Sequence, residues 1–362
     1  MCEKMRLNAD YNDQMCCMGC SGNRGYMGRQ GKASLKFENP PGIISTGCVA
    51  GKKEGEGPLG QLIDEIVMDP MAGKNTWEEA ESELQTRAAR HAIEKAGISA
   101  NRIRYLFAGD LLGQSIASTF GLMDMNVPLF GLYGACSTMG ESLALGSAFV
   151  NAGYGEFVMC VTSSHFASAE KQFRFPLDYG NQRPFAATWT VTGSGAVILG
   201  QTGGNVCVKG ITTGKIVDYG IRDSMNMGAA MAPAAAETIH RNFLDFGVDP
   251  SYYDKIITGD LGEVGQQALI DLLAKKNCDI SDCHMDCGIE IFDGKTQDTH
   301  AGGSGCGCAA VTLCAKLIKK LEEKDWRRIL FVPTGALLSP TSFNEGQNIP
   351  GIAHAIILER RQ

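Results

Sequence analysis

Long apolar runs are missing from this sequence. No run approaches the roughly 18 residues that a membrane span requires, and the N-terminus lacks the apolar segment of a secretory signal peptide. There is also no block of basic residues, and the formal net charge is −7. These absences argue against a transmembrane protein, a secreted protein and a protein that mainly binds nucleic acid. We therefore expect a protein of the cell interior.

Cysteine, in contrast, is abundant, with 14 in 362 residues. In a long chain without a signal peptide, we interpret these cysteines as reduced thiols. Residues 1–33 mix Met, Cys, Gly, Asn and Arg without a period, so we expect a disordered leader there. A second group, Cys278, Cys283, His284 and Cys287, fits no common zinc spacing. We interpret it as a loop leading into a strand at 288–292, and we expect neither a metal nor a cofactor.

Two similar β-α-β patterns indicate an internal duplication. When Cys136 is aligned with Cys308, each is followed by a helix rich in small residues and then by a strand, at 157–162 and 329–334. Upstream, residues 106–111 match residues 256–261, so that Asp110 aligns with Asp260. Short apolar runs alternating with helical patterns favour parallel strands covered on both faces. The sequence thus predicts a duplicated α/β fold.

Cys136 is the residue on which a chemical function most depends. It stands between a strand and a helix, at a helix start where free backbone N–H groups favour a thiolate. A buried structural cysteine is the alternative, since free cysteine is among the most buried residue types. Two further segments are candidates: the glycine-rich turn at 300–308, which suits either anion binding or close packing, and the polar connection from Glu170 to Pro184.

These features resemble the thiolase and ketoacyl-synthase superfamily, where the equivalent cysteine carries the acyl group. The resemblance to one family is closer and extends from residue 34 to the C-terminus. It rests on residues 37–40, 53–59, 108–112, 134–138, 162–165, 172–174, 232–236, 258–261, 301–306 and 334–341. Together these motifs resemble the stage V sporulation protein AD family of spore-forming bacteria.

The resemblance implies a thiolase-like, internally duplicated five-layer αβαβα fold. It also implies a protein that binds pyridine-2,6-dicarboxylic acid (dipicolinic acid), alone or as its calcium chelate, for a channel of the developing spore. The implied partners are membrane subunits of that channel and, in a homodimer, a second copy. The implied location is the spore cytoplasm, at the inner spore membrane through those partners. We predict halves at 34–210 and 211–362.

The residues themselves give a reason to expect binding without catalysis. Acyl transfer requires neutral donors or imidazoles beside the thiol, whereas Asp260 stands where the superfamily's first partner follows its strand. A carboxylate near Cys136 disfavours a thiolate. His300 and His354 lie near other catalytic positions of the superfamily, so convergence of these histidines with Cys136 would keep an acyltransferase as the alternative. A third hypothesis is a structural partner of the membrane subunits with a vestigial pocket.

A flat dicarboxylate requires cations, backbone N–H groups and an apolar wall. We expect it in the cleft between the halves, close to Cys136, with Arg174 or Arg183 on a carboxylate. The predicted binding residues are Cys136, Arg174, Arg183, Asp260, Gly302, Gly303, Ser304 and His354.

Overall fold

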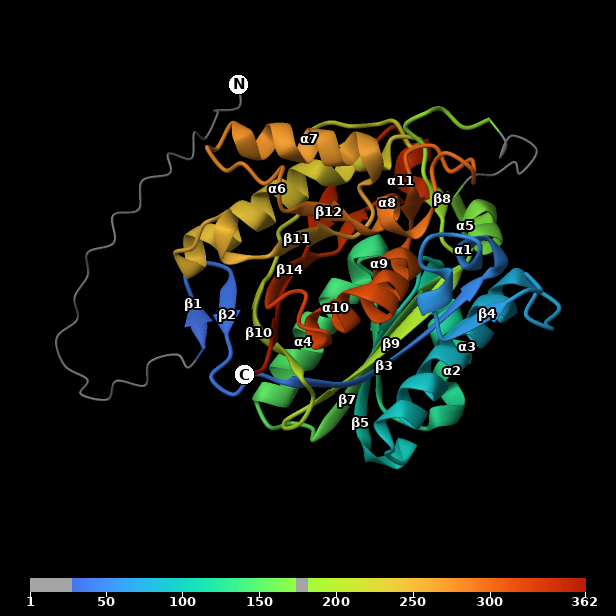
Figure 1. The fold of residues 1–362 in the computed structure, drawn as a ribbon. Coiled ribbons are helices and arrows are strands. Elements are labelled where there is room, and N and C mark those ends of the chain that lie inside the picture. The colour runs from blue at the N-terminus through green and yellow to red at the C-terminus, as the bar shows by residue number, and fades with distance from the viewer. Residues whose placement is uncertain (1–27, 174–181) are drawn as a thin grey trace, which may run out of the picture.

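Five layers of secondary structure make up the protein (Figure 1). The computed structural model describes residues 28–173 and 182–362. Helices α2 (Trp77–Ala96) and α3 (Ile116–Leu122) form one outer layer, and α6 (Met227–Phe246) and α7 (Gly262–Ala274) form the other. Between the two sheets lie α4 (Thr138–Asn151), α9 (Cys306–Thr312) and α10 (Ile318–Glu322). The predicted five-layer α/β fold is confirmed.

The strand order repeats between the two parts of the chain. The first set runs in the order β3-β9-β7-β5-β6 and the second in the order β10-β17-β14-β11-β12. In each set the last three strands are parallel and the second runs antiparallel to the third. The first set comprises β3 (Gly42–Gly51), β5 (Ile103–Gly109), β6 (Leu129–Leu132), β7 (Phe157–Ser164) and β9 (Gly193–Gly200). The second comprises β10 (Val206–Thr212), β11 (Lys255–Thr258), β12 (His284–Asp286), β14 (Arg328–Val332) and β17 (Ala355–Arg360). The aligned strands occupy matching places, which confirms the duplication.

The two sets of strands form the two sheet layers, and hydrogen bonds join these layers at one edge. Val206 and Cys207 of β10 pair with Ile43 and Gly42 of β3. The predicted division between residues 210 and 211 falls within β10, the first strand of the second set.

The described structure begins before Ser34, the first residue after the predicted leader. Strand β1 (Arg29–Gln30) pairs with β2 (Ser34–Lys36). The Asp245 carboxylate at the end of α6 accepts the backbone N–H groups of Lys32 and Ala33, at 3.0 and 2.9 Å. Residues 1–27 of the predicted leader lie outside the described residues.

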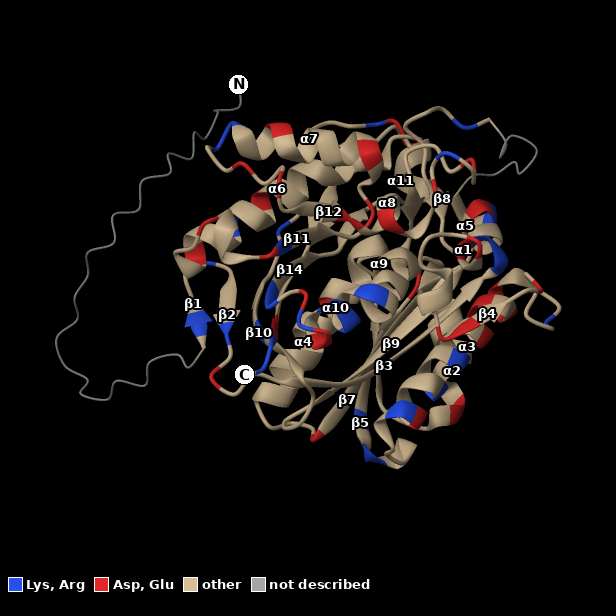
Figure 2. Ribbon diagram, in the orientation of Figure 1, with Lys and Arg blue, Asp and Glu red and all other residues tan. Residues whose placement is uncertain are grey.

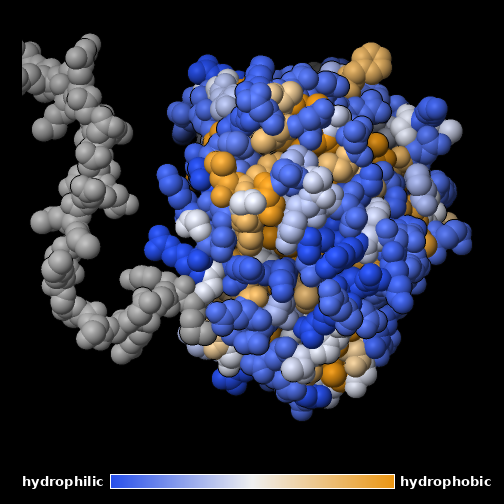
Figure 3. Space-filling model, turned by 60° about the vertical axis from the view of Figure 1, so that its left-hand side comes forward, coloured by the Kyte–Doolittle hydropathy of each residue, from blue (hydrophilic) through white to orange (hydrophobic). Residues whose placement is uncertain are grey.

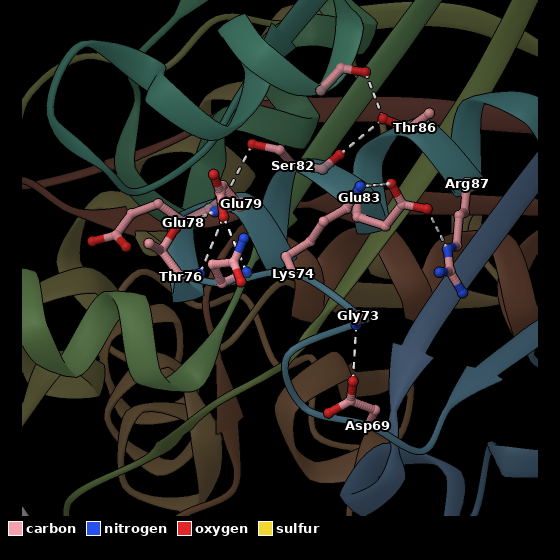
Figure 4. Close-up of polar contacts among 12 residues, drawn as sticks. Asp69, Gly73, Lys74, Thr76, Glu78, Glu79, Ser82, Glu83, Thr86 and Arg87 are labelled. Atoms are coloured by element: carbon pink, nitrogen blue, oxygen red, sulfur yellow. Dashed lines mark hydrogen bonds and ion pairs between the residues drawn. The ribbon is translucent and has the colours of Figure 1, made fainter.

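Three apolar clusters hold the layers together. One fills the space between the sheets around α4 and α9, one lies under α6 and α7, and one lies under α2. A capping box fixes the start of α2 (Figure 4): the Thr76 hydroxyl accepts the Glu79 N–H, and the Glu79 carboxylate accepts the Thr76 N–H. Such a box satisfies backbone donors that the first helical turn leaves free.

Shorter elements complete the structure. They are β4 (Glu65–Val67), β8 (Trp189–Thr190), β13 (Gly303–Ser304), β15 (Thr334–Ala336), β16 (Gly351–Ala353), α1 (Lys52–Gly55), α5 (Phe166–Phe173), α8 (Cys287–Ile291) and α11 (Pro340–Asn344). Two predictions were wrong here. The expected strand at 288–292 is largely the helix α8, capped by the Asp286 carboxylate on the Gly288 N–H. The expected polar connection from Glu170 begins as the last turn of α5.

Charged residues of both signs lie on the outer helices, whereas most of the ribbon of the sheets is uncharged (Figure 2). The face shown in Figure 3 is largely hydrophilic, and its apolar residues form small separate groups. Within residues 28–173 and 182–362, no helix has the length and apolar character needed to cross a bilayer.

Candidate functional site

A cavity of about 460 Å³ lies where the two sets of elements meet. The first half of the chain contributes the turn before α4 and the end of α5. The second half contributes the residue Asp260 after β11, the turn before α9 and the first turns of α6. Residues 336–341 close one side. The volume falls within the range of small-molecule sites. Cys136, Asp260 and Ser304 all line this cavity, so the structure brings three of the predicted site residues together.

Cys136 faces the cavity because the chain turns sharply just before it. Ala135 has a left-handed backbone, with φ of 51°, which is a strained conformation for a residue with a Cβ atom. Hydroxyl groups hold the turn: Ser137 donates to the Gly134 carbonyl at 2.7 Å and Thr138 donates to the Ala135 carbonyl at 2.6 Å. The Cys136 side chain is half-buried and lies in a short 3₁₀ turn, Ala135–Ser137, that leads into α4. The predicted position at a strand-to-helix turn is therefore correct.

Asp260 is the polar centre of the cavity wall. It is fully buried, and its carboxylate accepts the Gly305 N–H at 2.9 Å and the Thr334 hydroxyl at 2.8 Å. The Cys136 thiol also hydrogen-bonds to it. Burial raises the pKa of Asp260 to about 7, despite these three hydrogen bonds. The carboxyl thus changes charge near neutral pH.

The Cys136 sulfur is held as a thiol. Burial raises its pKa well above the ordinary value, and the neighbouring Asp260 carboxylate raises it further. Since the thiolate is the nucleophilic form, this arrangement opposes acyl transfer. The position at a helix start favours a thiolate, but burial and the Asp260 carboxylate have the larger effect on the pKa of Cys136.

The glycine-rich turn contributes only its second half to the cavity. Ser304 and Gly305 line it, whereas Gly302 and Gly303 do not. Gly303 and Ser304 form β13, which pairs with β8. Gly305 needs its freedom, because it has φ of 101° and a Cβ atom there would lie 2.6 Å from the Ser164 hydroxyl. The turn therefore packs closely and also presents the N–H that binds Asp260.

Arg183, His300 and His354, three of the predicted binding or catalytic residues, do not line this cavity. Arg183 bonds to Asp298 at 2.7 Å and lies 5.0 Å from the Trp189 ring. His300 contacts the Pro184 carbonyl at 2.8 Å, and His354 accepts the Gly214 N–H at 3.3 Å. Burial lowers the pKa of His354 to about 4, so this imidazole is neutral. The convergence of His300 and His354 with Cys136, which the acyltransferase alternative required, is not observed. Arg174 lies outside the described residues.

Sequence reasoning missed several lining residues. Glu170 is buried in the cavity wall near the end of α5, and Tyr133 covers another side. Met227 and Met231 come from the start of α6, far away in the sequence. Asn226, the helix cap immediately before Met227, could have marked the start of this helix. Among the described lining residues there is no lysine, arginine or histidine.

Comparison with known proteins assigns this chain to a family. A family model for stage V sporulation protein AD matches residues 31–359. The stage V sporulation protein AD of Bacillus subtilis (strain 168) is 42% identical over 330 residues, which cover 91% of this chain and 97% of that protein. The chain belongs to the stage V sporulation protein AD family. The resemblance inferred from the sequence is confirmed.

Solved structures with the same fold include enzymes. The 3-oxoacyl-[acyl-carrier-protein] synthase III of Aquifex aeolicus VF5 is 15% identical, with a TM-score of 0.55, over 88% of this chain and 99% of that one. A cerulenin-bound OleA of Xanthomonas campestris is 14% identical, with a TM-score of 0.56, over 90% and 97% of the two chains. At this identity the similarity shows the thiolase-like fold alone. For this member of the sporulation family, function must therefore be argued from the cavity itself.

Proposed function

We propose that the protein binds dipicolinate in the cavity beside Cys136, as a component of the spore's dipicolinate uptake and release system that performs no acyl transfer. The observation that carries the proposal is the buried carboxyl of Asp260 hydrogen-bonded to the Cys136 thiol, in a chain that belongs to the sporulation family. The carboxyl keeps the thiol protonated, which favours a binding pocket over a nucleophilic centre.

The charge of the cavity favours a calcium-paired ligand. Its described lining carries the carboxyl groups of Asp260 and Glu170 and no cationic side chain. A bare dianion beside the buried Asp260 carboxyl meets no cationic side chain among the described lining residues to offset its lost hydration. A calcium chelate neutralises the ligand, and a protonated Asp260 donates a hydrogen bond to it. Arg174 stays a predicted source of positive charge.

Titration calorimetry tests the proposal, with dipicolinate added alone and with equimolar calcium. We expect saturable binding that is tighter with calcium, and at least a tenfold loss of affinity in Cys136→Leu, whose larger side chain takes up part of the cavity. Cys278→Ser, at a half-buried cysteine that does not line the cavity, is the matched control. No binding with or without calcium would contradict the proposal and leave a structural role with a vestigial pocket.

An acyltransferase is the alternative, favoured by one observation: the Cys136 side chain faces a cavity at a helix start. Incubation with acyl-CoA followed by intact-mass measurement separates the two functions. We expect no adduct. An acyl adduct that is absent in Cys136→Ala would overturn the non-catalytic assignment.

We further propose a homodimer through β6. This strand ends the first set, and its outer edge has no partner among the described residues. Leu129 and Phe130 are 41% and 42% exposed, and exposed apolar strands at a sheet edge favour pairing with another chain. Light scattering should show a dimer that Phe130→Glu converts to a monomer, whereas Phe343→Glu on α11 leaves it intact. A monomeric parent protein would refute the dimer.

The remaining partners are the membrane subunits of the spore channel, through which we propose that the protein lies at the inner spore membrane. Membrane fractions of spores lacking those subunits should lose the protein to the soluble fraction. Retention in the membrane fraction would contradict this part of the proposal.

A further inference from the structure

A second cavity, of about 480 Å³, lies on the other side of α5 and β8. We call it the aromatic groove. Three aromatic rings line it, from Trp77, Phe166 and Trp189. Lys52 and Lys53 of α1 lie at its rim. Neither the family comparison nor the cavity beside Cys136 accounts for this combination of rings and ammonium groups.

Local structure fixes each ring in place. Trp77 is the first residue of α2, and it directly follows Thr76 of the capping box. Figure 4 shows the hydrogen bonds between Thr76 and Glu79 that fix this helix start. Phe166 begins α5, and its backbone N–H donates to the Thr192 hydroxyl at 3.1 Å. The rings of Phe166 and Trp189 stack with centroids 3.9 Å apart and planes 8° from parallel. A preformed aromatic surface of this kind reduces the ordering cost of binding a flat ligand.

Two ammonium groups lie beside these rings, and the carboxyl groups of Glu54 and Glu56 also line the groove. The Lys53 ammonium lies 4.4 Å from the centre of the Trp189 ring and donates to the Gln297 carbonyl. Since an ammonium has three donors, it keeps donors for a ligand. Lys52 is exposed, and its contact with Glu56 is a long 3.8 Å between two exposed side chains, a kind of pair that contributes little.

The other titratable groups of the groove weaken this positive charge only in part. Burial raises the pKa of Glu54 to about 7, so its carboxyl is partly protonated near neutral pH. His165 is neutral: burial lowers its pKa, its Nε2 donates to the Pro70 carbonyl, and its Nδ1 accepts the Ala167 N–H. The groove is therefore more positive than the cavity beside Cys136, whose described lining has carboxyl groups and no cation.

We propose that the aromatic groove is a second binding site, for a flat aromatic carboxylate whose ring packs against Trp77 and Phe166 and whose carboxylate meets the ammonium groups of Lys52 and Lys53. The inference deepens the proposed function, because dipicolinate belongs to this class of ligand. The groove combines aromatic rings with the cationic groups that the described lining of the Cys136 cavity lacks.

A shared wall separates the two sites, and it consists of α5 and β8. Successive residues of a strand point to opposite faces; accordingly, Trp189 lines the groove and Thr190 lines the cavity. On α5, Phe166 lines the groove, whereas Ala169 and Phe173 line the cavity. Two anionic ligands on either side of this wall repel each other. We therefore expect the second molecule to bind more weakly than the first, and calcium to reduce the difference.

Tryptophan fluorescence reports on the groove directly. The chain has 3 tryptophans, of which Trp77 and Trp189 line the groove and Trp326 packs against the core between the sheets. In a Trp326→Phe background, all tryptophan emission comes from the groove. Titration with dipicolinate and, separately, with benzene-1,3-dicarboxylate should quench this emission saturably. Lys52→Met should raise the ligand concentration at half-saturation at least fivefold. Lys275→Met, an exposed lysine just after α7, is the matched control.

A second measurement keeps this test independent of the proposed function: protection of Cys136 from alkylation by dipicolinate. Quenching of tryptophan without protection of Cys136 would support binding in the aromatic groove and refute binding in the cavity beside Cys136. Protection of Cys136 without quenching would support binding in that cavity and refute binding in the groove. If the ligand concentration at half-saturation is equal in Lys52→Met, Lys53→Met and the parent protein, the proposed binding site in the groove is wrong. Lys53→Met carries a folding risk, since its ammonium bonds to Gln297, so the exposed Lys52 decides the outcome.

Discussion

Replacing Asp260 by asparagine should make the Cys136 thiol more reactive. The carboxyl of Asp260 has a pKa of about 7, so it is mostly ionised at pH 8, where it raises the pKa of the neighbouring thiol. Asparagine keeps the size and two of the contacts: its carbonyl oxygen accepts the Gly305 N–H, and its amide donates to the Thr334 hydroxyl oxygen. The negative charge is lost.

The size of the effect follows from Coulomb's law. Two unit charges about 4 Å apart interact by about 4 kcal/mol at an effective dielectric constant of about 20. Water in the cavity screens the pair, so we take about 1–2 kcal/mol, which is roughly a 5- to 30-fold larger thiolate fraction. A less basic thiolate is also a weaker nucleophile, with a Brønsted coefficient of about 0.4–0.5. The net expectation is alkylation of Cys136 about 2- to 8-fold faster in Asp260→Asn.

The assay is the rate of modification by iodoacetamide, followed peptide by peptide in a mass spectrometer. Cys278, which does not line the cavity, serves as the internal control and should react equally in both proteins. Below pH 6 the ratio of the two Cys136 rates should approach one, because Asp260 is then largely protonated in the parent. An equal or slower rate in Asp260→Asn at pH 8 would refute the reasoning.

Three further outcomes concern stability in urea. Because the pKa of buried Asp260 rises from 3.8 to about 7 on folding, this residue's contribution to stability falls by roughly 4 kcal/mol between pH 4 and pH 8; Asp260→Asn should flatten the pH profile, and parallel profiles would contradict this. Thr76→Ala should cost about 1 kcal/mol, and Ser99→Ala, whose side chain makes no cap bond, should cost less; equal losses would argue against the capping box. Ala135→Gly should stabilise by about 0.5–1 kcal/mol, since its φ is 51°; a loss of stability would show that the turn is not strained.

The duplication could be predicted because it depends on local patterns. Apolar strands, small-residue helices and the aligned pairs Cys136–Cys308 and Asp110–Asp260 recur in order, and pairing of parallel strands follows from such patterns. The meeting of Cys136 and Asp260 could also be anticipated, since each follows a strand that ends at the same side of its sheet. These inferences required only chain order.

The failures depend on tertiary context. The run at 288–292 looks like a strand, but the Asp286 side chain caps it as a helix, a signal that the Asp-Cys-Gly sequence did contain. Arg183 looked free to bind a ligand, yet Asp298 and the Trp189 ring hold it outside the cavity. Which of several cations reaches a pocket depends on long-range packing that no local pattern encodes.

The hydrogen bonds between β3 and β10 limit how a ligand can enter. They join the two sheet layers at one edge, and the apolar cluster between the sheets draws residues from both. Parts tied together in this way do not separate like the lobes of a hinged binding protein. Access to Cys136 must therefore come from small local movements at the rim, such as residues 336–341 and the end of α5. The rate of ligand uptake would then depend on the loops around the mouth of the cavity, while the frame that holds Asp260 stays rigid.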